Sequence, residues 1–359
     1  MSDDQAVTDW TARYLGSWWT AAPADAEGVL TGQVVTATVD SQYYEDVGVE
    51  VTRAPHVNVE YAKAMLLVTR DTSEGVIRAV CPEQRLAYRS QPGRGQLHIV
   101  GCDAEAVATA TARLTREAVR GQLLRDGWAV LHASAVADED GRAFLTFGQK
   151  GAGKTTAALT LATCHGLRLL ANDRVFVRPD GDVGVEVLPW PSAAAVGLGL
   201  LDALGWYEVA QEWMVGGEQL HPTQDWRVTA ALRAGVSMPL WDKGRELKAQ
   251  ICPDQFERWF RVPLAVSGSA AALVFPRVDE EAVPAEENTV RTLSDGDFMG
   301  GQAEDRYPDV FGLLGVDGGG AHGVRQEVAW RLGALPHHSV VLAHDVVANA
   351  DLLEKILGV

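Results

Sequence analysis

One run of residues in this sequence has the composition and spacing of a phosphate-binding loop, Gly148-Gln149-Lys150-Gly151-Ala152-Gly153-Lys154-Thr155. It satisfies the pattern G-x-x-x-x-G-K-[ST] in full. Glycines let the backbone turn so that successive N–H groups face one anion, and the positive end of the following helix adds to the attraction. In this pattern the lysine reaches the β- and γ-phosphates, and the Thr155 hydroxyl binds Mg²⁺. The sequence therefore predicts a site for ATP or GTP with Mg²⁺, formed by Gly148, Lys150, Gly151, Ala152, Gly153, Lys154, Thr155 and Thr156.

A carboxylate follows this loop after one helix and one short strand. Asp173 comes 19 positions after Lys154 (173 − 154), directly behind an apolar stretch at 169–171. Parallel strands joined by one helix end at the same edge of a sheet, where ligands bind. Asp173 is therefore a candidate Mg²⁺ ligand, or a candidate catalytic base for an attacking hydroxyl. The alternative is a carboxylate in a surface turn, which Asp favours for local reasons.

His132 is the next candidate catalytic residue. It lies within the apolar segment 128–136, which we predict to be one strand. A histidine in such a strand is often an ordinary core residue. If its strand neighbours the strand before the loop, His132 would assist Asp173 as a proton relay or donate to phosphate.

Three further cations are candidate contacts for phosphate or substrate. Arg174 either pairs with Asp173 or clamps phosphate. Arg245 and Lys248 lie in a basic stretch of an otherwise acidic chain. Mobile cations stabilise charge on a transferred phosphoryl group, so either residue could serve there. The alternative for both is an exposed helix start, and for Lys150 a solvated position in the loop.

The pattern around the loop favours an α/β fold in which strands and hairpins flank one phosphate-loop unit. We predict a strand at 143–147, a helix through Leu161, a strand at 167–171 and a core strand at 271–279 that stops at Pro276. Overall we predict a β-rich N-terminal domain at 1–102, a connecting helix at 103–127 and a P-loop domain at 128–359. The acidic, Gly-rich stretch 280–325 is predicted to be a long loop or lid.

Composition narrows the class of protein. The chain has 359 residues, 47% of them hydrophobic, and a net charge of −17 (31 − 48). This indicates a globular chain of about two domains and argues against a nucleic-acid partner, which attracts clustered Lys and Arg. The acidic start of the chain lacks a signal peptide, and no run approaches the ~20 apolar residues of a membrane span, so we expect a cytoplasmic protein that does not enter a membrane. The four cysteines form no CxxC pair and are expected to be free thiols.

The block LHASAV…GRAFLTFGQKGAGKTTAALTLA…LRLLANDRVFV, within residues 128–178, resembles the catalytic core of HPr kinase/phosphorylase and its relatives, whose fold is related to phosphoenolpyruvate carboxykinase. The resemblance implies an HPr kinase/phosphoenolpyruvate carboxykinase-like α/β core beside a smaller β-rich α+β domain. It also implies Mg²⁺-dependent transfer of phosphate from a nucleotide to a hydroxyl.

Position by position, His132 matches the histidine of the family's strand, and residues 148–155 match its P-loop. Asp173 matches the second acid of its Asp-Asp pair, and Asn172 stands where the family has the first. If that first acid is the base, Asp173 or His132 must serve here, or catalysis has been lost.

We do not find the family's segment for docking HPr, so the expected acceptor is a small molecule or a peptide rather than HPr. Two functional hypotheses follow. One is a kinase that uses Lys154, Asp173 and His132, and the other is a nucleotide-binding switch or scaffold without catalysis. A carboxykinase or phosphorylase is a weaker third. Some relatives form hexamers, which leaves a homo-oligomer open.

Overall fold

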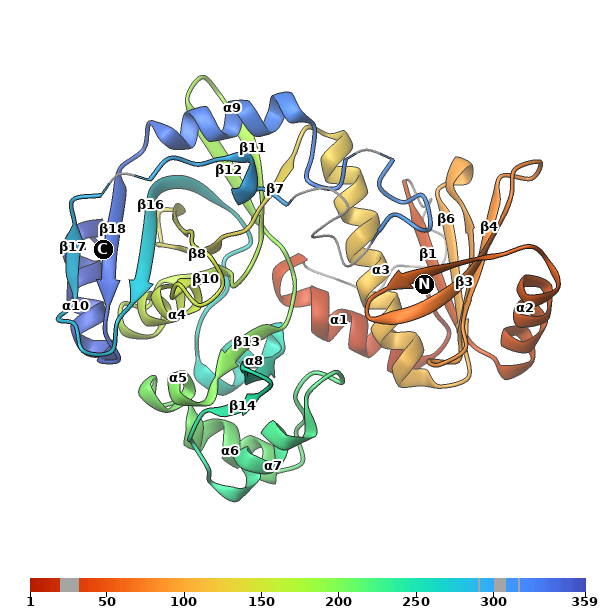
Figure 1. Ribbon diagram of the computed structural model, residues 1–359, viewed down its shortest axis with the longest axis horizontal. Coiled ribbons are helices and arrows are strands. Elements are labelled where there is room, and N and C mark those ends of the chain that lie inside the picture. Colours follow the sequence, from red (N-terminus) through yellow and green to blue (C-terminus); the bar gives the residue numbers. More distant parts are fainter. Residues whose placement is uncertain (20–31, 290, 300–307, 316) are drawn as a thin grey trace. The chain divides into compact units, whose positions relative to one another are not determined.

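The computed structural model describes residues 1–19, 32–289, 291–299, 308–315 and 317–359. The protein is a mixed α/β chain with several sheets and divides into two compact units, which Figure 1 colours along the sequence. The first unit comprises Met1–Gly16, Thr20–Trp128 and Met299–Ala321. The second comprises Ser17–Trp19, Ala129–Phe298 and His322–Val359. Each unit therefore contains segments that are distant in the sequence.

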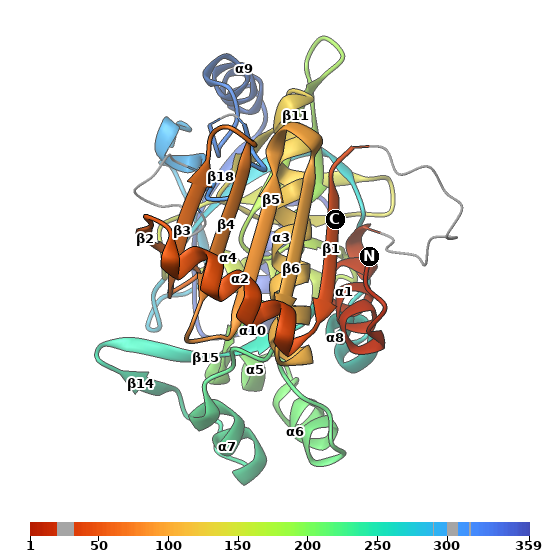
Figure 2. The same ribbon diagram turned by 90° about the vertical axis from the view of Figure 1, so that its right-hand side faces the viewer.

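The first unit is built on one sheet with helices on both faces (Figure 2). Helix α2 (Ser41–Arg53) covers one face, where it packs on Val80, Ala87 and Val100. Helix α3 (Ala104–Arg125) covers the other face, over alternate strand residues that include Ala79, Tyr88 and Ile99. This alternation is the pattern of strands buried on both faces. The strand order is β1 (Val34–Val39), β6 (Gln96–Gly101), β5 (Leu86–Gln91), β4 (Val76–Cys81), β3 (Ala64–Asp71) and β2 (Val57–Tyr61), with the 3₁₀ turn Pro92–Arg94 between β5 and β6.

The structure supports the predicted β-rich character of this region and adds to it. Six strands, with helix α2 between β1 and β2, occupy the part of the chain predicted to be β-rich. Helix α1 (Gln5–Trp19) precedes them. Helix α3 lies within the predicted helix 103–127, and its start is set by the Asp103 carboxylate, which accepts a hydrogen bond from the Ala106 N–H at 2.9 Å. It differs from a connector, however, because it packs within the first unit.

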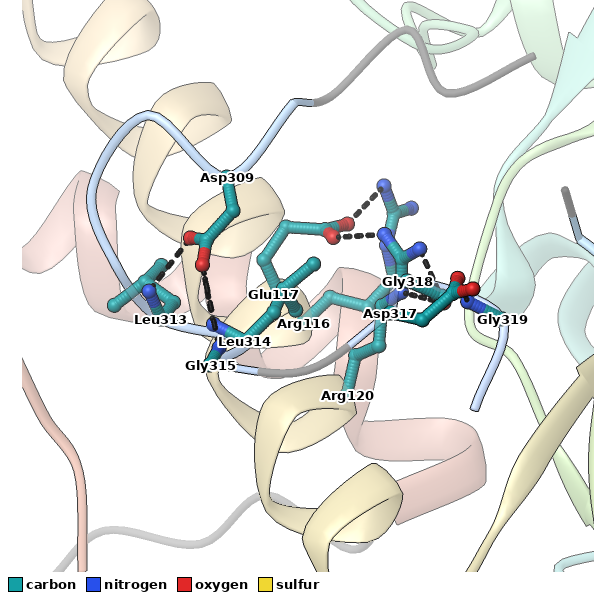
Figure 3. Close-up of polar contacts among 10 residues, drawn as sticks. All are labelled: Arg116, Glu117, Arg120, Asp309, Leu313, Leu314, Gly315, Asp317, Gly318 and Gly319. Carbon is teal, nitrogen blue, oxygen red and sulfur yellow. Dashed lines mark hydrogen bonds and ion pairs between the residues drawn. The ribbon is translucent and has the colours of Figure 1, made fainter. Parts of the chain in front are cut away.

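Residues 309–315 and 317–319 are held against helix α3 by buried charges (Figure 3). Arg120, which is fully buried, donates to the Gly318 carbonyl at 2.9 Å and pairs with Glu117 at 2.9 Å. The Asp309 carboxylate accepts from the backbone N–H groups of Leu313 at 2.7 Å and Leu314 at 3.1 Å. These described residues are irregular, as the predicted loop requires, but they are anchored on the first unit. The predicted loop 280–325 also contains β17 (Ala285–Glu287), the 3₁₀ turn Asp295–Asp297 and the start of α9 at His322, which belong to the second unit.

The second unit is built on a larger sheet, with nine strands among the described residues. Its main path runs β10 (Arg168–Ala171), β8 (Ser134–Ala137), β9 (Arg142–Thr146), β16 (Gly268–Val278), β12 (Gly184–Pro189), β11 (Val175–Asp180) and β7 (Ala129–Leu131). Strand β18 (His337–Leu342) pairs with β16, and β17 (Ala285–Glu287) pairs with β18.

Five strands of this sheet run in the same direction, namely β9, β10, β11, β16 and β18; β11 is one of them because both it and β16 pair antiparallel with β12. Strand β16 is parallel to β9 and to β18. Strand β10 is also parallel to β9, because both pair antiparallel with β8 between them. Helices α4 (Lys154–Cys164) and α10 (Val346–Leu357) pack on one face through residues such as Leu161 and Leu353, and α9 (His322–Gly333) packs on the other through Val328 and Leu332. The carboxyl ends of β9 and β10 therefore lie at one edge, as predicted.

Residues 190–260 form a small α/β layer that joins the core on the α4 side. Its helices are α5 (Leu198–Ala203), α6 (Tyr207–Val215), α7 (Trp226–Ala234) and α8 (Pro253–Phe260). They accompany a three-stranded sheet of β13 (Ala194–Gly197), β15 (Arg245–Ile251) and β14 (Leu240–Asp242). Trp190 and Trp206 are buried as core residues, whereas Trp226 and Trp241 are exposed.

Two strand predictions are wrong in detail. The segment 128–136 is two strands, β7 and β8, which pair at opposite ends of the sheet path, and His132 lies between them rather than within a strand. Strand β16 does not stop at Pro276, which pairs in register with Val340 of β18. No helix in the described part of the chain is long and apolar enough to cross a membrane. Cys81, Cys102, Cys164 and Cys252 are all free thiols.

Candidate nucleotide site

The glycine loop begins at the carboxyl end of β9 and leads directly into helix α4. Pairing with β16 continues one residue beyond β9, where the Phe147 N–H donates to the Val274 carbonyl at 2.8 Å. Gly153 has a φ of +102° and lies against β16, so that a Cβ there would come 2.7 Å from a methyl group of Val278. Gly151 has a φ of +87° but open space around it. Glycine is therefore required at 153 for both backbone conformation and space.

The first turn of α4 presents backbone N–H groups without a competing side chain. Its N-cap is Gly153, which has no capping side chain, and the first turn holds no acidic residue. The first N–H groups of a helix have no partner within the helix, so they and the positive helix end attract an anion. Thr155 and Thr156 lie in this turn and are half-buried. This end of α4 has the features of a phosphate-binding loop.

Lys154 interacts electrostatically with the other charged side chains of the site. Its ammonium donates a hydrogen bond to the Gly148 carbonyl at 2.6 Å. Burial lowers the pKa of Lys154, the Asp173 and Asp297 carboxylates act against that shift, and the cations Arg291 and Lys248 add to it. Four charged groups from three segments of the chain are therefore within electrostatic range of Lys154.

The segment that holds His132 and the segment that holds Asp173 run antiparallel to each other near the loop. Strand β10 pairs with β8 through Ala171 and Ala135, and β11 pairs with β7 through Val175 and Leu131. The register is the same on both sides of the gap between these pairings. Residues 132–134 therefore run beside residues 172–174.

This register decides which side chains are opposite each other. Continued through the gap, it sets His132 opposite Arg174, Ser134 opposite Asn172, and Ala133 opposite Asp173. The Ser134 hydroxyl donates to the Asn172 carbonyl, in agreement with this. Asp173 and His132 are thus close along the ladder but are not directly opposite each other.

The acids and amides at this turn differ in burial. Asn172 is 7% exposed, and its side-chain oxygen has no hydrogen-bond partner among the described residues. Asp173 has half of its side chain exposed and pairs with Arg174 at 3.3 Å. Arg174 also lies over the ring of Trp190, with its guanidinium carbon 5.7 Å from the ring centroid. The ion pair makes Arg174 a structural partner of Asp173 in this state.

Two charged residues of the site were missed by sequence reasoning. Asp297 is 6% exposed and forms an ion pair with Arg291. Its carboxylate also accepts from the Ser294 N–H at 2.9 Å, and its backbone carbonyl accepts from the His132 N–H at 2.8 Å. The only sequence signal was an arginine shortly before the capping pattern SDGD, within a stretch interpreted as loop.

The remaining candidate cations differ in how near they lie to Lys154. Lys248 on β15 is within electrostatic range of Lys154 and pairs with Glu246 at 3.4 Å. Arg245 is exposed on the β14–β15 hairpin, where it is opposite Asp242, and Lys150 is exposed in the loop. No contact ties either of these two to Lys154 among the described residues.

The oxygen donors present suit a hard divalent cation. The described residues contain no group of three or more His, Cys, Asp or Glu side chains that could hold a metal. Mg²⁺ at nucleotide sites is commonly held by one or two protein oxygens together with phosphate oxygens and water. Thr155 and Asp173 would supply such a hydroxyl and carboxylate.

Comparison with known proteins adds no relative, since no family model matches this chain and no curated protein matches it significantly.

Proposed function

We propose that this protein binds ATP or GTP with Mg²⁺ at residues 148–156 and transfers the γ-phosphoryl group to a hydroxyl of a small molecule or peptide, in an HPr kinase-like P-loop core. The observation that carries the proposal is the half-buried Lys154 at the start of α4, with the Asp173 carboxylate close enough to influence its pKa. A cation and a carboxylate beside a glycine loop are the elements that phosphoryl transfer needs.

The residues would act as follows. Backbone N–H groups of the loop and of the first turn of α4 hold the β- and γ-phosphates. Lys154 exchanges its bond to Gly148 for phosphate oxygens and neutralises their charge. Mg²⁺, held by Thr155 and Asp173, supplies charge neutralisation and orients the phosphates. The acceptor oxygen forms a bond to the γ-phosphorus as the bond to the β–γ bridging oxygen breaks, and the nucleoside diphosphate leaves.

Asp173 is the better candidate base for the acceptor proton. Asn172 carries no ionisable proton and cannot serve. Half of the Asp173 side chain is exposed, so an acceptor can reach it, and its pair with Arg174 is one that solvent weakens. The segment with His132 lies beside it and supports Asp297 through the backbone. We assign His132 the secondary role of a proton relay or phosphate donor.

A second candidate is a nucleotide-binding switch or scaffold without transfer. Asn172 motivates it, because the family pattern has an acid there, and a buried amide in its place is compatible with binding alone.

Incubation with γ-labelled ATP, Mg²⁺ and a panel of hydroxyl acceptors separates the two. Transfer that Lys154→Ala and Asp173→Asn abolish, and that Lys150→Ala preserves, supports the kinase. The Lys150 variant is the matched control, since it removes an exposed loop lysine. Nucleotide binding in the wild type without transfer to any acceptor supports the switch. Absence of nucleotide binding contradicts both.

A further inference from the structure

Arg291 lies beside the root of the phosphate loop through a series of aromatic contacts. Its guanidinium carbon is 5.1 Å from the centroid of the Phe275 ring. Phe275 in turn stacks on Phe147, with centroids 5.6 Å apart and planes inclined by 28°. Phe147 is the residue immediately before Gly148. Two aromatic contacts therefore link Arg291, from a distant segment, to the residue that precedes the loop, and this link is geometric rather than electrostatic.

The partner of Arg291 is the Asp297 carboxylate, which already accepts hydrogen bonds on both of its oxygens. One oxygen of Asp297 accepts from Arg291, and the other accepts from the Ser294 N–H at 2.9 Å and the Ser294 hydroxyl at 3.3 Å. Its side chain is 7% exposed, whereas that of Arg291 is 38% exposed. A carboxylate that is buried and bonded on both oxygens holds its partner in place. Asp297 is therefore suited to position Arg291 rather than to act as a base.

The remaining donors of Arg291 are available to a ligand. A guanidinium carries five N–H donors in a fixed fork. Among the described residues, the only hydrogen bond from Arg291 goes to Asp297 through one terminal nitrogen. A guanidinium that is partly exposed and anchored on one side can donate two parallel hydrogen bonds to a phosphate.

We infer that Arg291 is a second cation of the nucleotide site, which contacts the terminal phosphate of a bound triphosphate, and that Asp297 is its positioning residue. This inference rests on the proposed nucleotide site and adds a residue that distinguishes a triphosphate from a diphosphate. Lys154 grips the phosphates from the loop, and Arg291 approaches from the segment after β17. The two cations then share the charge that develops on the transferred group.

The test is a calorimetric titration of the full-length protein with ATP and with ADP, each in the presence of Mg²⁺, which measures the two affinities. For Arg291→Ala we expect ATP to bind about tenfold more weakly, because a charge-assisted contact is lost, while ADP binding stays near that of wild type. Asp297→Asn is expected to reduce the preference for ATP in the same direction and by less. The control Arg178→Ala removes an arginine of similar exposure, 42%, from another ion pair, and should change neither affinity.

The readout is the ratio of the affinities for ATP and ADP. A general loss of fold would lower both affinities together and leave their ratio unchanged. Because Arg291→Ala leaves Asp297 buried without its cation, Arg291→Lys gives the same comparison with the charge retained. It should keep part of the preference for ATP, since an ammonium lacks the fork. If both Arg291 variants keep the wild-type ratio while Lys154→Ala abolishes binding, the inference is wrong and the nucleotide site stands. If the wild type binds neither nucleotide, the proposed function and the inference both fail.

Discussion

Lys154 donates a hydrogen bond to the carbonyl oxygen of Gly148, 2.6 Å away, so its ammonium group is held by its own loop. A nucleotide would have to replace this bond. The same ammonium is partly desolvated, and burial lowers its pKa. The protonation state of Lys154 should therefore depend on the charge of any ligand bound next to it.

The affinity for ATP should therefore fall as the pH rises through the lowered pKa of Lys154, because only the protonated form attracts phosphate. The loss should begin at a lower pH than for a solvent-exposed lysine, and binding in this range should take up a proton. Calorimetry in two buffers with different ionisation enthalpies measures that uptake. Lys154→Arg keeps its charge at every accessible pH and should lose the dependence. Equal slopes for the two proteins would contradict this assignment.

The free protein should show the opposite trend in stability. The pKa of Lys154 is lower in the folded state than in the unfolded chain, so the unfolded chain binds more protons between the two values. Unfolding free energy contributed by this group then rises with pH across that interval. Denaturant unfolding of wild type and Lys154→Met over the alkaline range measures it. A smaller rise in the variant is expected, and an identical rise would refute it.

Replacing Gly153 by alanine should abolish nucleotide binding. The new Cβ would meet Val278 at 2.7 Å in a backbone conformation with a φ of +102°, so the start of α4 must shift. Gly151→Ala has the same type of backbone strain but open space, and should weaken binding less. Titration with ATP ranks the two variants. Equal affinities would show that contact with β16 does not shape the loop.

Asn172→Asp should destabilise the protein by about 1–3 kcal/mol at neutral pH, because it places a carboxylate where a buried oxygen already lacks a partner. Desolvation raises the pKa of such a carboxyl. The penalty should therefore be small below the ordinary carboxyl pKa and grow as pH rises above it. Thermal unfolding at acidic and neutral pH measures the difference. Asn172→Ala, which adds no charge, should show no such pH dependence.

Gly121→Ala should destabilise the first unit, although alanine is the better helix former. A Cβ at Gly121 would lie 2.1 Å from the Leu313 carbonyl oxygen, so residues 309–315 and 317–319 would be forced away from α3. We expect a loss of about 1–3 kcal/mol. Gly48→Ala in helix α2 meets nothing within 4 Å and should instead gain about 0.5–1 kcal/mol. Chemical denaturation of both variants makes the comparison, and a stabilising Gly121→Ala would disprove the close approach.

Local sequence signals predicted the elements around the loop well. The spacing of glycines, a capping Asp103 and apolar stretches before and after the loop identified β9, α4, β10 and α3, because these signals act over a few residues. Helix α2 was missed since its apolar residues are few and Val49 faces solvent. Strand β16 runs past Pro276 although proline lacks an N–H, because the ladder bonds at that residue do not all need one.

Long-range relations were beyond such signals. The position of Asp297 beside Lys154 depends on the fold of a segment more than a hundred residues later, and nothing in SDGD distinguishes a site carboxylate from a turn. The break at His132 is equally non-local. It arises because β7 and β8 take different partners in the sheet.

The anchoring of residues 309–315 and 317–319 on helix α3 has a consequence for biosynthesis. Arg120 is fully buried only when the Gly318 carbonyl is in place. A ribosome has then translated past residue 318 before the N-terminal sheet and its helices can reach their final packing. Until then the first unit is incomplete and the Arg120 side chain stays in contact with water, while residues 129–298 of the second unit leave the ribosome. C-terminal truncations before residue 309 should therefore damage the N-terminal unit as well as the other.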